Sequence, residues 1–116
     1  MSSARQSPKT LRSDARALVQ GCAGWNSRLA ARRITQFLDR ELAGTGLSVG
    51  PLGLMAQIAV VESDLRRRAV WLTETGARRL EAAIPLWRKA HTKLAKVLST
   101  NLARRLADQA ETLGEA

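Results

Sequence analysis

Residues 73–98 read TETGARRLEAAIPLWRKAHTKLAKVL, and this stretch decides the fold class. Its core-type positions alternate in steps of three and four residues, namely Ala77, Leu80, Ile84, Trp87, His91, Leu94 and Leu98. That spacing is the a/d seam of a heptad repeat and predicts a long amphipathic helix. Thr73 is the predicted N-cap, with Glu74 in the first turn where the helix dipole favours a negative charge. Pro85 falls inside the helix and predicts a kink.

The N-terminal half shows the same helical period. Two successive apolar stripes carry it, Leu11, Ala15, Leu18, Cys22, Trp25 and Leu29, then Ala30, Ile34, Phe37, Leu38 and Leu42. They predict a long helix that starts after Ser13 and stops at Gly44. Gly21 and Gly24 weaken that helix and indicate either a break or a close approach of another helix. Residues 1–12 are expected to form a flexible basic arm.

A last amphipathic helix is predicted from Leu102, Leu106, Gln109 and Leu113. Between the two long helical regions, Ser48 is expected to cap a short helix with Leu52, Met55, Ile58 and Ala59 on its apolar side. The following residues 58–73, IAVVESDLRRRAVWLT, have the pattern of a β-hairpin with a basic tip. Ile58 and Ala59 therefore fit both the end of this helix and the start of the first strand. Because a helix cannot continue directly into a strand, we expect the sequence to be discontinuous near residues 58–60.

Composition points to an anionic partner. The 116 residues contain 19 Lys+Arg against 10 Asp+Glu, a net charge of +9, and 15 of the cations are arginine. Arginine stays charged at any pH and binds phosphate oxygens with two hydrogen bonds at once, so nucleic acid is the first partner to consider. One Phe, three Trp and no Tyr are too few rings for the stacking platforms of single-strand binders.

Other features exclude whole classes of protein. A single cysteine rules out an internal disulfide, and no Cys/His set has the spacing of metal ligands. One histidine and one cysteine far apart provide no catalytic constellation, so we expect no enzyme, no cofactor and no metal. The length of 116 residues predicts one domain, or one domain plus a helical extension. The absence of a signal core and of a long apolar run predicts a cytoplasmic protein that does not enter a membrane.

Two segments resemble the MarR family of bacterial winged helix-turn-helix regulators. They are WNSRLAARRITQFLDRELAGTGLSVGPLGLMAQIA from residue 25, and DLRRRAVWLTETGARRLEAAIPLWRKA from residue 64. The second contains Asp64-x-Arg66, then Val70-x-Leu72-Thr73 and Gly76, which is similar to the end of the family's wing and the start of its long dimerisation helix. The resemblance implies a mainly α fold, with residues 13–46 and 73–116 as the helical dimerisation region and residues 47–72 as the remnant of a winged lobe with one small β-hairpin.

The resemblance also has a gap. In the family, a third helix, the recognition helix and the first wing strand stand between the second helix and the wing, and here they are absent. The gap coincides with the discontinuity near residues 58–60. We expect the native chain to contain the missing segment, with a true deletion as the alternative.

The resemblance implies a homodimeric repressor that binds double-stranded DNA and is released by a small molecule or an oxidant. Arg66, Arg67 and Arg68 would then contact DNA from the wing, because a narrow minor groove and its phosphates attract arginine. Asp64 would restrain Arg66 through an ion pair. The alternative for all four residues is a solvated charged turn.

The resemblance further implies a cleft that binds a small aromatic acid effector, with Trp25, Arg28 and Met55 as lining residues. A core tryptophan with a solvated arginine is the alternative. Cys22 is a candidate redox switch, or else an inert small hydrophobe. His91 is expected to pack at a helix or dimer interface, with a pH switch as the alternative.

A second function class stays open from the residues alone. The chain could be a basic helical interaction protein, such as an antitoxin-like dimer or a nucleic-acid-associated dimer that binds through charge.

Overall fold

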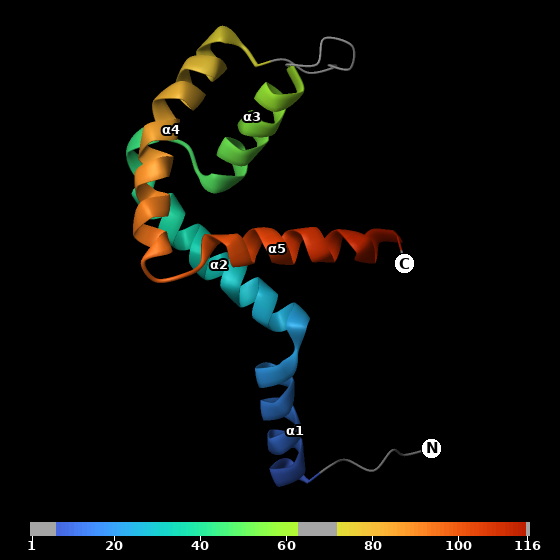
Figure 1. The fold of residues 1–116 in the computed structure, drawn as a ribbon. Helices are drawn as coiled ribbons and strands as arrows, with labels where there is room; N and C mark the ends of the chain where they lie inside the picture. The colour runs from blue at the N-terminus through green and yellow to red at the C-terminus, as the bar shows by residue number, and fades with distance from the viewer. Residues whose placement is uncertain (1–6, 63–71, 116) are drawn as a thin grey trace. The chain divides into compact units, whose positions relative to one another are not determined.

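The computed structural model describes residues 7–62 and 72–115, and every regular element in these ranges is a helix (Figure 1). In chain order these are α1 (Pro8–Gly21), α2 (Ala23–Glu41), the 3₁₀ helix η1 (Ala43–Thr45), α3 (Val49–Glu62), α4 (Glu74–Ala95), α5 (Thr100–Glu111) and the 3₁₀ helix η2 (Thr112–Glu115). The expectation of a mainly α protein is confirmed. The chain divides into two compact units, Met1–Gln36 and Phe37–Ala116, with the boundary inside α2.

The predicted β-hairpin wing is wrong. Residues 58–61, expected as its first strand, form the last turns of α3, which also runs without interruption through the predicted discontinuity. No Gly or Pro lies between Leu54 and Glu62 to stop the helix, and a helix satisfies its backbone hydrogen bonds locally whereas a strand needs a paired neighbour. The rest of the expected hairpin, residues 63–71, lies outside the described residues.

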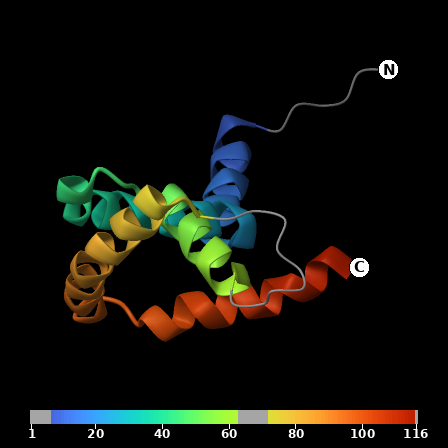
Figure 2. The same ribbon diagram turned by 90° about the horizontal axis from the view of Figure 1, so that it is seen from above.

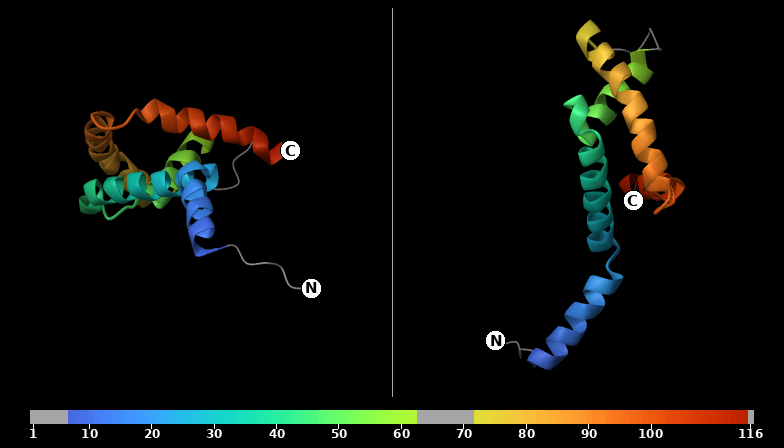
Figure 3. Two further views of the ribbon diagram at one scale, coloured as in Figure 1. Left: turned by 90° about the horizontal axis from the view of Figure 1, so that it is seen from below. Right: turned by 90° about the vertical axis from the view of Figure 1, so that its left-hand side faces the viewer.

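The N-terminal unit contains a break between two helices (Figure 3). Its first helix begins at Pro8 and not after Ser13, because the Ser7 hydroxyl accepts a 3.1 Å hydrogen bond from the Thr10 N–H and proline suits the first turn. Residues 8–12 of the expected flexible arm are therefore helical. The chain leaves α1 at Cys22, between the two glycines that indicated a break, and α2 begins at Ala23.

The second unit turns at η1. Gly46 has a φ of 73° in the left-handed region, where only glycine is unstrained, and the Thr45 hydroxyl donates a 2.7 Å hydrogen bond to the Leu42 carbonyl. The next helix, α3, starts at Val49, close to where Ser48 predicts it. Its first N–H is satisfied by an Asp39 carboxylate oxygen at 2.8 Å.

The core of this unit lies between α3 and α4, which run side by side (Figure 1, Figure 2). Its buried members are Leu42, Leu47, Leu52, Leu80 and Ala83. Around them pack the partly buried side chains of Val49, Met55, Ala59, Leu72 and Ile84. Burial of these apolar groups is what stabilises the unit, at roughly 25 cal/mol per Å² removed from water.

The predicted start of α4 is confirmed, since the Thr73 hydroxyl accepts a 2.9 Å hydrogen bond from the Gly76 N–H. The helix continues through Pro85. Glu81, whose carbonyl loses its helical hydrogen bond to the proline, and Pro85 itself are both exposed to solvent. Its buried residues are Leu80, Ala83, Ala90 and Leu94. The packed face therefore includes two alanines that the heptad seam omitted, because an alanine allows neighbouring backbone to come close.

No residue of α5 is buried. Its leucines Leu102 and Leu106 are each about half exposed. Leu113 in η2 is more exposed than either of them. An amphipathic helix whose apolar side faces water has an unpartnered surface.

Candidate functional site

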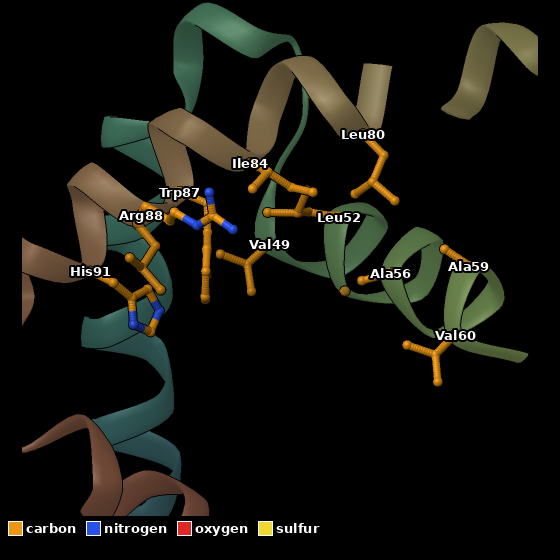
Figure 4. A pocket seen from close by; sticks show the side chains of 12 residues that line it. Val49, Leu52, Ala56, Ala59, Val60, Leu80, Ile84, Trp87, Arg88 and His91 are labelled. Atoms are coloured by element: carbon orange, nitrogen blue, oxygen red, sulfur yellow. The ribbon is translucent and has the colours of Figure 1, made fainter. Parts of the chain in front are cut away.

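An apolar cleft of about 580 Å³ opens between α3 and α4 in the second unit (Figure 4). It is lined by Leu38, Val49, Leu52, Gly53, Ala56, Ala59, Val60, Leu80, Ile84, Trp87, Arg88 and His91. Small-molecule sites typically occupy about 300–1,000 Å³. The cleft is therefore large enough for a small organic ligand.

Small side chains on α3 keep the cleft open. Gly53, Ala56 and Ala59 are spaced three residues apart along the helix and together present little volume toward α4. Opposite them, Leu80 and Ile84 form the apolar wall that α4 contributes. The result is a hydrophobic floor with no acidic side chain among its lining residues.

The polar groups of the cleft gather at one end. Figure 4 shows Trp87, Arg88 and His91 together, away from Ala59 and Val60 at the other end. The Trp87 and His91 rings are tilted at 42° with their centroids 4.7 Å apart. A guanidinium beside an apolar slot fits a ligand with a carboxylate at one end and a hydrophobic body at the other.

Two of the three predicted effector residues lie together, in the other unit. Trp25 and Arg28 line a surface hollow of about 310 Å³ on α2, with Leu29, Ala31 and Arg32. Met55 lies in the second unit, where it packs against the core and its terminal methyl lies 3.9 Å from the position that a Cβ on Gly76 would take. Met55 is not among the residues that line the α3–α4 cleft.

Cys22 forms part of the break between α1 and α2. Its sulfur accepts a hydrogen bond from the Trp25 N–H at 3.4 Å, in the position of a helix N-cap. The Asn26 side-chain amide donates to the carbonyls of Val19 at 3.1 Å and Cys22 at 2.8 Å, so it satisfies groups that the end of α1 leaves open. The thiol is half-buried and free of any disulfide.

The predicted DNA-contacting residues Asp64, Arg66, Arg67 and Arg68 lie outside the described residues. Within the ranges 7–62 and 72–115, exposed arginines occur on α1, α2, α4 and α5, whereas α3 contains none. Some are neutralised locally, since Arg78 pairs with Glu74 at 2.6 Å and Arg104 with Asp108 at 3.1 Å. Arg28, Arg32 and Arg33 form no ion pair with a described residue.

No group of three or more His, Cys, Asp or Glu side chains among the described residues could hold a metal ion. None of the described helices is long and apolar enough to cross a membrane.

Arg88 and the alanines of α3 were missed as site residues at the level of sequence. A signal for Arg88 was present, since Ile84, Trp87, Arg88 and His91 share one side of a helix by their spacing. The pairing of that side with α3 was not visible, because it depends on a contact between distant segments.

Comparisons with known protein families, with curated proteins and with solved structures found no match for this chain.

Proposed function

We propose that this protein is a homodimeric DNA-binding transcriptional regulator, a repressor that a small apolar acid releases from double-stranded DNA. The observation that carries the proposal is the α3–α4 cleft with Arg88 and His91 at one end. A helical protein that only coats DNA through charge has no need of a ligand-sized apolar cleft. The net charge of +9 and the resemblance of two segments to the MarR family support DNA as the partner.

A second copy of the chain is the proposed partner of the exposed apolar surfaces. Leu11 and Leu18 of α1 are 56% and 60% exposed, and Leu102 and Leu106 of α5 are 53% and 50% exposed. Helices at both ends of a short chain thus carry apolar stripes that its own core does not cover. Pairing two copies would bury them and would place two DNA-binding units about one helical turn apart.

The proposed mechanism is a population shift. An acid in the cleft contacts α3 and α4 together, so it binds best to the spacing of these helices that fits it. If DNA favours another spacing, the ligand lowers the affinity for DNA by the ratio of its affinities for the two states. We place this activity in the cytoplasm, where the DNA would be accessible.

A competition experiment tests the proposal. The full chain is bound to a labelled duplex from the region upstream of its own gene, and unlabelled random-sequence duplex is added at physiological salt. A regulator should prefer its own region by about 10³-fold or more, and benzoate, as a simple aromatic acid, should lower that affinity. Equal competition by both duplexes would contradict the proposal.

The second candidate is a basic helical interaction protein that binds DNA through charge. The observation that favours it is that residues 58–61, expected to form the first strand of the wing, are helical. Such a protein should lose affinity for specific and random duplexes equally as salt rises. The same competition experiment, repeated over a range of KCl concentrations, separates the two candidates.

A further inference from the structure

The positive charge is concentrated in the N-terminal unit. Residues 1–36 contain seven Lys+Arg and one acid, 7 − 1 = +6, which is two thirds of the net charge of +9 in less than a third of the chain. Six of these seven cations are arginine. This unit therefore has a much higher charge density than the unit that contains the cleft.

The arginines of α2 that belong to the N-terminal unit have no acidic residue nearby in the sequence. No Asp or Glu occurs between Asp14 and Asp39, while Arg28, Arg32 and Arg33 fall within six residues. All three are exposed, and none forms an ion pair with a described residue. Elsewhere the pattern differs, since Arg78, Lys93 and Arg104 each pair with a carboxylate.

Arg28 and Arg32 are one helical turn apart, about 6 Å along the axis at 1.5 Å per residue. They share one side of α2 with Trp25 and Leu29, and together these residues border the hollow of about 310 Å³. Like charges at this spacing destabilise a helix when nothing neutralises them. A polyanion would remove that cost and would gain from both guanidinium groups.

In α1 the cations also occupy one side. Lys9, Arg12 and Arg16 recur at intervals of three and four, and all are exposed. The apolar residues Leu11 and Leu18 point away from them, because steps of 100° per residue place the two sets on opposite sides of the helix. A partner that contacts the basic side therefore leaves the apolar side available for a second copy.

We propose that the basic sides of α1 and α2 in the N-terminal unit form a contact surface for the phosphate backbone of duplex DNA, independent of base sequence. The inference rests on the proposed DNA-binding function and assigns its electrostatic anchor to Lys9, Arg12, Arg16, Arg28, Arg32 and Arg33. Charge complementarity selects the partner, because arginine forks bind phosphate oxygens in a bidentate manner. A lipid surface would need the apolar and basic sides of α1 to face it together, and these two sides lie opposite each other on the helix.

The test compares two triple variants of the full chain with equal charge. R28Q/R32Q/R33Q removes the three α2 arginines of the N-terminal unit, and R78Q/R104Q/R105Q removes three exposed arginines from the other unit, so both have a net charge of +6. Circular dichroism checks that each stays folded, as expected for exposed positions. Binding to a labelled 30-base-pair random duplex is then measured by fluorescence anisotropy across KCl concentrations.

We expect the α2 variant to lower the slope of log K against log [KCl] by about 2.7 if all three arginines contact phosphates, at about 0.9 per contact. The control should change the slope by less than about 1 on the same scale. Equal changes in the two variants, or an unchanged slope in the α2 variant, would overturn the assignment of the contact surface to α1 and α2. The proposed DNA-binding function would not be affected by that result. A wild-type chain that binds no duplex, or that binds vesicles of phosphatidylserine in preference to duplex, would overturn the proposed function as well.

Discussion

Asp39 of α2 holds the start of α3, since its carboxylate oxygen accepts a 2.8 Å hydrogen bond from the N–H of Val49. Val49 is the first residue of α3, contacts the core and lines the cleft. The carboxylate also meets the positive end of the helix dipole. One side chain therefore both stabilises α3 and positions the helix that forms one wall of the candidate site.

Replacing Asp39 with alanine should lower the free energy of unfolding by about 0.5–2 kcal/mol, the usual cost of losing an N-cap acceptor. Asp39→Asn keeps an acceptor oxygen at the same place and should cost less. Urea unfolding followed by circular dichroism measures both. Equal losses in the two variants would show that the charge matters and the hydrogen bond does not.

Gly46→Ala should destabilise the second unit. The φ of 73° costs a residue with a Cβ about 1–2 kcal/mol, and the added carbon would lie 3.3 Å from the Arg79 guanidinium nitrogen that donates to the Gly46 carbonyl. Gly44→Ala is the matched control, because a Cβ there meets nothing within 4 Å and the φ is not positive. Thermal unfolding should show a lower Tm for the first variant alone.

Cys22→Ser tests whether the cysteine is a cap or a redox switch. A serine oxygen is a better N-cap acceptor than sulfur, so we expect unchanged or slightly higher stability, while Cys22→Ala should lose up to about 1 kcal/mol. If the cysteine is only a cap, hydrogen peroxide should leave DNA binding by the wild type and by Cys22→Ser equally unaffected. If peroxide releases the wild type from DNA but does not release Cys22→Ser, the signal that controls DNA binding is an oxidant.

Leu106→Glu should separate the proposed dimer. The leucine is half exposed on the apolar side of α5, so a charge there would stay buried and unpaired in a pair of helices. Ala107→Glu adds the same charge at an exposed position about 100° around the helix from Leu106 and should leave the assembly unchanged. Sedimentation velocity at micromolar concentration distinguishes a dimer from a monomer. A monomeric wild-type chain would remove the dimer from the proposal.

Arg88→Gln should weaken binding of benzoate to the cleft about 10-fold, the equivalent of about 1.4 kcal/mol for a lost charged partner. Lys89→Gln removes the same charge from the next residue of α4, which does not line the cleft, and should have little effect. Ala56→Phe should abolish binding by filling the space. Isothermal titration calorimetry measures all three, and unchanged affinity in Arg88→Gln would reject its role.

The helical period and the cap residues predicted much of the secondary structure. Thr73 caps α4 as expected, and the glycines at 21 and 24 bracket the break at Cys22. The strand at residues 58–61 was wrong, because β-branched residues such as Val60 and Val61 only favour a strand when another strand pairs with them. Of the predicted effector residues, Trp25 and Arg28 lie together at a separate hollow on α2, whereas the α3–α4 cleft was not predicted.

The order of residues along this chain is enough to specify its net charge, its helical content and most of its helix ends, since these depend on groups within about one turn of each other. Long-range contacts specify the rest. Ala83 is fully buried while Trp87 stays 38% exposed, because the backbone of α4 packs against its neighbours through small residues. The cleft likewise exists only where Gly53, Ala56 and Ala59 face Leu80 and Ile84, a pairing that no local pattern encodes.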